Sequence, residues 1–135
     1  MADPRWVIDA SALLAYLRDE PGSDVVEQAL LRGAAMSAAN LAEVLSKIAE
    51  IGEDPKQVMD GFRRRGFTGQ TMEVLPLTEE DSYLIADLHR KTRTIGLSLG
   101  DRACLGLALR LGIPALTADR TWSRIRLGIK VETIR

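Results

Sequence analysis

Four acidic residues, Asp9, Glu43, Asp101 and Asp119, stand where their carboxylates could do chemistry together. No residue close in sequence is an evident partner for Asp9 or Asp119. Unpaired carboxylates that lie together repel one another and are costly to bury. Mg²⁺ and Mn²⁺ prefer oxygen ligands, and such an ion can activate water and neutralise charge on a phosphodiester. The acids therefore predict metal-dependent hydrolysis, provided that the fold brings them together.

The elements that must position these acids alternate between short apolar strands and helices. Continuous hydrophobicity predicts strands covered on both faces. We expect strands at residues 6–8, 34–37, 74–77, 113–117 and 130–134, the third an edge strand because of Pro76. Helices are expected at about residues 12–18, 23–33, 41–52, 55–66, 79–93 and 99–112, with Ser11 capping the first. This order predicts a three-layer α/β/α sandwich with a mostly parallel sheet, in one domain spanning residues 1–135.

In such a sheet, the ends of the strands and the starts of the following helices lie on one rim. Asp9 ends the first strand, and Asp119 lies two residues past the end of a late strand. Glu43 and Asp101 each stand in the first turn of a helix, Asp101 at the head of an apolar stripe. We therefore expect the four acids to meet in one cleft.

Each acid also has a structural interpretation. Asp9 could cap a helix, Asp101 could form half of a capping box with Ser98, and Asp119 could be a turn residue. Glu43 lies on a polar helical stripe, four residues before Lys47, so periodicity alone favours a solvated role for it.

Composition excludes several other classes of protein. The net charge of −1 rules out a simple basic sleeve for nucleic acid, and 4% aromatic residues argue against base-stacking platforms. The single cysteine, Cys104, excludes an internal disulfide and a cysteine-rich zinc site. No apolar run approaches the roughly 18 residues of a membrane span, and the first residues do not resemble a signal peptide. We expect a cytoplasmic protein with no membrane partner.

Four segments containing these acids resemble the motifs of PIN domains, specifically the VapC toxins of type II toxin–antitoxin pairs. They are residues 7–13 (VIDASAL), 39–44 (ANLAEV), 98–108 (SLGDRACLGLA) and 116–122 (LTADRTW). The resemblance implies a metal-dependent endoribonuclease. It makes Asp9 and Asp101 the central Mg²⁺ ligands, with Mn²⁺ plausible, and Glu43 and Asp119 the residues that complete the site. For Glu43, it reverses the interpretation from periodicity.

Other polar residues near the motifs acquire roles from the same resemblance. Four of them are expected to orient the carboxylates or metal-bound waters: Ser11, Asn40, Ser98 and Thr117. Arg102, beside Asp101, could contact phosphate or balance the acids. Among the basic clusters of the chain, Arg120 and Arg124 are the best candidates to hold the RNA backbone, because they follow Asp119 directly.

The resemblance also implies partners. They are a cognate VapB-type antitoxin, whose chain lies across the cleft and blocks it, and a second copy of the chain in a homodimer. The expected helices between residues 41 and 65 carry more apolar side chains than a small sheet covers, which favours such contacts: Ile48, Ile51, Val58, Met59 and Phe62.

Three rival functions remain open. A haloacid-dehalogenase-type phosphatase would need an aspartate where Ser11 stands, and a receiver domain would need a lysine near Thr117. The main alternative is a catalytically degenerate PIN domain that acts as an RNA- or protein-binding regulatory module.

Overall fold

The computed structural model describes residues 3–65 and 72–135, whose strands form one five-stranded sheet. The strand order is β3-β2-β1-β4-β5, and every neighbouring pair is parallel. The strands are β1 (Trp6–Ile8), β2 (Ala34–Ser37), β3 (Met72–Leu75), β4 (Ala115–Thr117) and β5 (Val131–Thr133). The chain builds outwards from β1 to β3 and then crosses to β4 on the other side of β1. The predicted parallel sheet is confirmed, and its switch point lies between β1 and β4.

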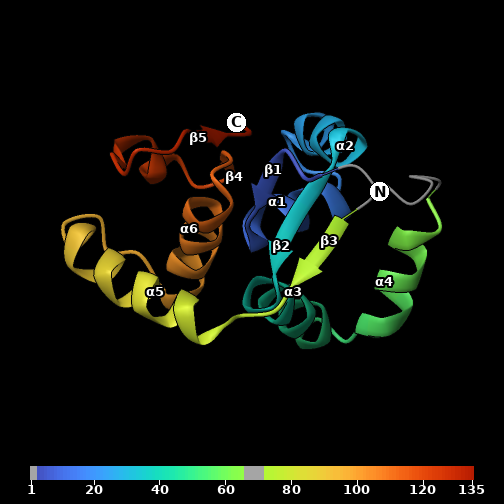
Figure 1. Ribbon diagram of the computed structural model, residues 1–135. Coiled ribbons are helices and arrows are strands. Elements are labelled where there is room, and N and C mark those ends of the chain that lie inside the picture. The colour runs from blue at the N-terminus through green and yellow to red at the C-terminus, as the bar shows by residue number, and fades with distance from the viewer. Residues whose placement is uncertain (1–2, 66–71) are drawn as a thin grey trace.

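Within the described residues, six α-helices and one 3₁₀ helix surround the sheet, with α5 packed on the outside of α6 and α4 beside α3 (Figure 1). They are α1 (Ala10–Leu17), α2 (Ser23–Arg32), α3 (Ala38–Glu50), α4 (Pro55–Arg63), α5 (Glu79–Lys91), α6 (Leu99–Leu111) and η1 (Arg120–Arg124). Helices α1 to α4 share one core cluster, and α5, α6 and η1 share the other. The three-layer α/β/α architecture is therefore confirmed.

Successive strand residues feed these two cores in turn, as the period of two requires. In β1, Ile8 packs with α1–α4 and Val7 packs with α6. In β4, Leu116 and Ala115 divide in the same way. All four side chains are buried, so both faces of the central strands are covered, which explains their continuous apolar sequence.

Local capping explains where most helices begin and end. Thr78 with Asp81, and Ser98 with Asp101, form the two predicted capping boxes at the starts of α5 and α6. Asp54 caps α4 as predicted, and α6 ends at Gly112, whose φ of +69° belongs to the left-handed region.

The structure corrects several boundaries. Helix α1 begins at Ala10 with Asp9 as its cap, so the prediction that Ser11 caps it is wrong. Strand β3 is an edge strand, as predicted, but it ends at Leu75, before the proline. The sequence pattern does not predict the 3₁₀ helix η1. Helix α4 ends at Arg63, whereas the expected terminus at Gly66 falls outside the described residues.

Across residues 3–65 and 72–135, no helix combines the length and the apolar character needed to cross a bilayer. The cytoplasmic location and the single-domain organisation stay predictions.

A buried ion pair joins α5 to α6. The Asp81 carboxylate is 3% exposed and accepts hydrogen bonds from Arg110 Nε at 2.7 Å and from the Thr78 backbone N–H at 3.0 Å. Burial alone would raise the pKa of Asp81, but the hydrogen bonds from Thr78 and Arg110 outweigh it and lower that pKa.

We expect Asp81→Ala to lower the free energy of unfolding by about 2 kcal/mol at pH 7, because both donors lose their charged acceptor. The carboxylate stabilises the fold above the pKa of the unfolded chain, about 3.9, and this contribution is lost as the pH falls through the lower pKa of the folded state. Chemical denaturation should therefore show a smaller difference in unfolding free energy between Asp81→Ala and wild type at pH 3 than at pH 7. In the same helix, Asp87 makes exposed ion pairs with Arg90 and Lys91. Asp87→Ala should cost less, and equal losses for the two variants would contradict this account.

Candidate active site at the sheet switch point

The Asp9 carboxylate lies where β1 ends, beside the switch point of the sheet, and it is 3% exposed. Its Oδ1 accepts the Ala12 backbone N–H at 2.8 Å, which caps α1. The Ser11 hydroxyl donates to both carboxylate oxygens, at 2.8 and 2.9 Å, and the Thr117 hydroxyl donates to Oδ2 at 2.6 Å. Ser11 and Thr117 therefore orient Asp9, while their role around a metal stays a prediction.

Backbone amides of the β4–η1 connection fix the direction of both hydroxyl protons. The Ala118 N–H donates to Ser11 Oγ at 3.0 Å, and the Asp119 N–H donates to Thr117 Oγ1 at 3.1 Å. Because each hydroxyl already accepts an N–H, its single proton is free to point at Asp9. The network therefore links the end of β1 to the end of β4.

Burial raises the pKa of Asp9 from 3.8 to about 6. The hydrogen bonds from Thr117, Ala12 and Ser11 oppose the rise, and the negative charge of Asp101 adds to it. The pKa of the Cys104 thiol is raised by its burial and further by Asp9 and Asp101, so this buried cysteine lies close to both acids. Its predicted role as a small buried apolar residue is confirmed.

Asp101 lies beside Asp9, in the first turn of α6, and is partly buried. Its Oδ2 accepts the Ser98 backbone N–H at 2.9 Å, and its own N–H donates to Ser98 Oγ at 3.1 Å. Ser98 thus fixes Asp101 through the capping box. Asp101 Oδ1 makes no hydrogen bond within the described part of the chain.

Glu43 reaches towards the same turn of α6 from α3. Its side chain is exposed, but its Oε1 lies only 2.5 Å from the point where a Cβ on Gly100 would stand. Among the ion pairs of the described residues, none joins Glu43 to Lys47, so the pairing suggested by periodicity is not formed.

Asn40, one turn before Glu43, is 1% exposed and therefore does not belong to a solvated stripe. Its Nδ2 donates to the Gly100 carbonyl at 2.9 Å, whereas its buried Oδ1 has no partner. An acceptor left unpaired in this way is costly, which marks the place as suited to a further donor or a cation.

Asp119 lies at the margin of this site. It is exposed, and its Oδ1 accepts the backbone N–H and the hydroxyl of Thr121 at 2.9 and 2.8 Å, which caps η1. Within residues 3–65 and 72–135, no three His, Cys, Asp or Glu side chains are grouped closely enough to hold a metal ion. The structure therefore brings Asp9 and Asp101 together and Glu43 to the same helical turn, but does not form the expected group of four. The assignment of all four acids to a metal stays a prediction.

Comparison with known protein families identifies the family of this chain. The family model that matches the chain is the PIN domain, over residues 6–127, a range that includes all four acids. The chain belongs to the PIN domain family. The family predicted from the four motifs is confirmed.

Several solved structures share this fold, and some of them are described as toxins or toxin–antitoxin complexes. DNA-bound VapBC from Salmonella typhimurium matches with a TM-score of 0.71 and 18% identity over 100% of both chains. Mycobacterium tuberculosis VapC20, described as a sarcin-ricin loop cleaving toxin, matches with a TM-score of 0.67 and 13% identity over 93% of this chain and 98% of that one. VapBC2 from Rickettsia felis, bound to a promoter DNA fragment, matches with a TM-score of 0.70 and 16% identity over 95% and 97%. These identities establish a shared fold. No curated relative matches the sequence.

The residues of this PIN site fit a divalent cation. Mg²⁺ is usually held by one or two carboxylates, with water and substrate phosphate filling its other positions. Asp9 and Asp101 supply two carboxylates close enough for the charge of Asp101 to raise the pKa of Asp9, a repulsion that a cation would relieve. The unpaired Asn40 Oδ1 and the oxygen-rich surroundings agree with a hard cation.

The three arginines assigned to RNA point in different directions. Arg102 Nη1 donates to the Ile85 carbonyl of α5 at 2.9 Å, and its Nε is buried without a partner. Arg120 Nε donates to the Arg135 carbonyl at 3.2 Å, and Arg124 is exposed and makes no ion pair in the described ranges. Arg102 and Arg120 are thus each bonded to a backbone carbonyl, whereas Arg124 is exposed. The assignment of all three to RNA stays a prediction.

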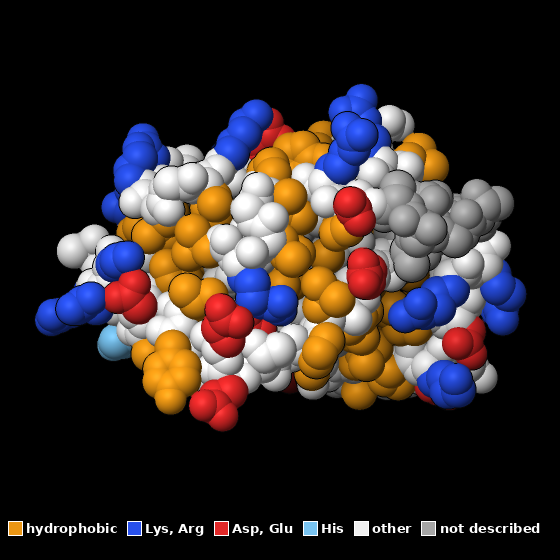
Figure 2. Space-filling model, viewed as in Figure 1, with side chains coloured by type: hydrophobic (Ala, Val, Ile, Leu, Met, Phe, Trp, Pro, Cys, Tyr) orange, Lys and Arg blue, Asp and Glu red, His pale blue; other side chains and the backbone are white. Residues whose placement is uncertain are grey.

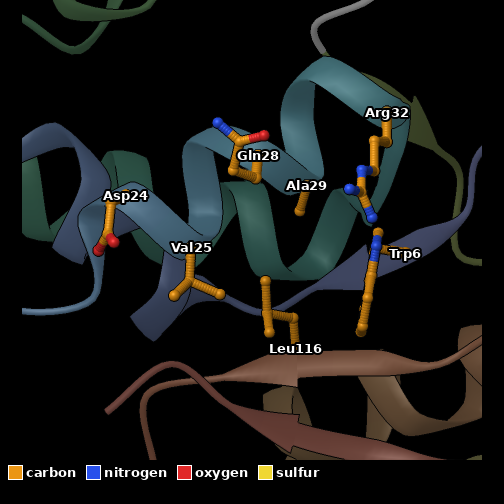
Figure 3. A pocket seen from close by; sticks show the side chains of 7 residues that line it. All are labelled: Trp6, Asp24, Val25, Gln28, Ala29, Arg32 and Leu116. Atoms are coloured by element: carbon orange, nitrogen blue, oxygen red, sulfur yellow. The ribbon is translucent and has the colours of Figure 1, made fainter.

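A separate pocket of about 250 Å³ lies between α2 and the sheet (Figure 3). Val25 and Ala29 project from α2 towards Trp6 and Leu116 of the sheet, with polar residues at its margin. None of the four acids lines it, so this pocket is distinct from the acidic site. Nothing in the periodicity of the sequence signals this pocket.

We expect the raised pKa of Asp9 to govern how the stability of the metal-free protein depends on pH. The folded state keeps a proton that the unfolded chain loses near pH 3.8, so this stabilisation is complete below about pH 4 and is lost as the pH rises through about 6. The difference corresponds to on the order of 3 kcal/mol. Urea unfolding from pH 4 to 7, with a chelator present, should show wild type losing stability relative to Asp9→Asn. The exposed Asp24 offers a matched control: Asp24→Asn should follow wild type. If the difference in unfolding free energy between wild type and Asp9→Asn did not change with pH, this would contradict the raised pKa of Asp9.

Proposed function

We propose that this PIN domain is the toxin of a type II toxin–antitoxin pair, acting as a Mg²⁺-dependent endoribonuclease. The observation that carries the proposal is the buried Asp9 carboxylate, held by three donors beside Asp101 at the switch point of a parallel sheet. The charge of Asp101 acts on this buried carboxylate, and no cationic side chain of the described residues bonds to Asp9, which favours a metal ion and an anionic substrate.

In this proposal, the side chains of the site position the reacting groups, and none of them acts as a titrating base. When bound, a divalent ion would supply activation of water and neutralisation of the charge on the scissile phosphate. Asp9 and Asp101 hold the ion, while Ser11 and Thr117 keep Asp9 in one orientation. Glu43 and Asp119 complete the acidic rim and orient the attacking water. The only histidine, His89, is exposed on α5, which agrees with a mechanism that needs no histidine base.

A VapB-type antitoxin is the proposed partner, as the VapBC neighbours suggest. A groove between α3 and α4 offers apolar surface from Leu41, Leu45 and Pro55. Figure 2 shows apolar surface over this part of the molecule, with basic side chains beside it. Such a surface suits a partner chain that then extends over the nearby acidic site.

The proposed homodimer has weaker support than the sequence suggested. Of the five apolar residues offered for it, Ile48, Met59 and Phe62 are buried in the core. Ile51 is 60% exposed and Val58 is partly buried, so these two remain available for contact.

The second candidate is a degenerate PIN domain that binds RNA or protein without cleaving it. One observation favours it: no group of three metal-ligating side chains forms in the part of the chain that the structure describes. Metal binding without cleavage of any RNA, in protein free of antitoxin, would decide for this alternative.

We expect Asp9→Asn to reduce RNA cleavage by at least about 100-fold while the protein stays folded, because asparagine keeps the shape of the side chain but removes its charge. Sequencing of RNA ends after induced expression measures cleavage and identifies the target. Asp87→Asn, which removes an exposed carboxylate from α5, should cleave as wild type does. Cleavage by Asp9→Asn at the full rate would refute the proposed mechanism.

Replacing both Arg120 and Arg124 by glutamine should weaken RNA binding and reduce the slope of log affinity against log salt by about 2, one for each lost phosphate contact. Filter binding of the inactive Asp9→Asn protein between low and high salt measures the slope. Arg90 is already paired with Asp87, so Arg90→Gln is the control and should leave the slope nearly unchanged. An unaltered slope in the double variant would exclude these two arginines from the RNA interface.

A further inference from the structure

Two side chains of α3 meet the first turn of α6 at one glycine. Asn40 and Glu43, three residues apart, lie on the same face of α3. Asn40 Nδ2 donates to the carbonyl of Gly100 at 2.9 Å, and Glu43 Oε1 lies against its α-carbon. A Cβ on Gly100 would stand 2.5 Å from that carboxylate oxygen, closer than real Cβ contacts allow.

The backbone does not require glycine here. Gly100 lies inside α6 and is absent from the glycines of the described residues with positive φ. Within a helix, glycine is less favourable than alanine because it costs more conformational entropy. Glycine therefore provides space at this position and does not serve an unusual backbone conformation. The Glu43 carboxylate occupies that space.

We propose that Gly100 is a positioning residue, whose missing side chain lets Glu43 bring a third carboxylate towards Asp9 and Asp101. The inference rests on the proposed function, since it assigns Glu43 to the metal site. Gly100 directly precedes Asp101 in the chain, so the Glu43 carboxylate lies against the same turn of α6 that carries the second acid. Asn40 holds the Gly100 carbonyl and so fixes how closely α3 approaches this turn.

The same geometry says what alanine would do at this position. The atom in its way is the far end of a flexible, exposed side chain that has no ion pair among the described residues. Glu43 can therefore swing into solvent at little cost to the fold. The substitution should separate metal binding from stability, because the helix gains a better helix former as the site loses a carboxylate.

Gly106, in the same helix, provides a matched control. A Cβ there would meet Ile85 Cγ1 and Leu84 Cβ at 3.7 Å, which is ordinary van der Waals contact. Gly106→Ala makes the same chemical change in α6 without touching Glu43.

The test titrates Mn²⁺ into the full-length, antitoxin-free protein by calorimetry and records melting curves without metal. Gly100→Ala should bind Mn²⁺ about 10-fold more weakly than wild type and melt at the same temperature or higher. Gly106→Ala should bind Mn²⁺ as wild type does. In a Glu43→Gln background, Gly100→Ala should cause no further loss, because the carboxylate it displaces is already gone.

Several results would overturn the inference. They are Mn²⁺ affinity within twofold of wild type in Gly100→Ala, a full additional loss in the Glu43→Gln background, or a melting temperature of Gly100→Ala below that of wild type. A crystal structure of Gly100→Ala with the Glu43 carboxylate still against α6 would do the same. Wild-type protein that binds no Mn²⁺ would instead remove the proposed function, and the inference with it. The two failures are thus distinguishable.

Discussion

The cost of burying one carboxylate shapes the centre of this molecule. Asp9 is almost fully enclosed where β1 ends, and its charge is opposed by both burial and Asp101. An amide and two hydroxyls donate to it, yet its pKa still rises to about 6. Neighbouring segments are therefore arranged to supply donors: Ser11 and Ala12 from α1, and Thr117 from β4. A doubly charged cation would offset the remaining unfavourable free energy of burying this negative charge.

The parallel topology makes this arrangement available. Since β4 lies beside β1, the connection after β4 can direct the amides of Ala118 and Asp119 at the two hydroxyls. Helix α6 packs on β1 from the opposite face to α1, and its first turn carries Asp101 to the same edge. Segments about a hundred residues apart therefore share one charged site, and their relative position depends on the sheet rather than on any local motif.

Features that depend on neighbours in sequence are the ones that could be predicted. The capping boxes at Thr78 and Ser98, and the buried strands, follow from local hydrogen bonding and from apolar patterning. The rule that strand ends and helix starts share one edge of a parallel sheet correctly predicted that Asp9 and Asp101 lie near each other. Glu43 shows the limit, because its periodicity correctly indicates an exposed side chain but does not reveal that its carboxylate lies against Gly100 in a distant helix. The burial of Asn40 and the formation of η1 likewise depend on tertiary contacts that no local pattern records.

The structural and chemical interpretations of the aspartates do not compete. Asp9 and Asp119 cap α1 and η1, and Asp101 completes the box at the start of α6. Each cap uses one carboxylate oxygen for a backbone N–H, and it fixes the side chain at a helix start where partial positive charge favours an anion. Capping therefore lowers the cost of gathering negative charge before any cation arrives. The same bonds that begin these helices orient the acids, so helix capping and the proposed cation binding draw on the same side chains.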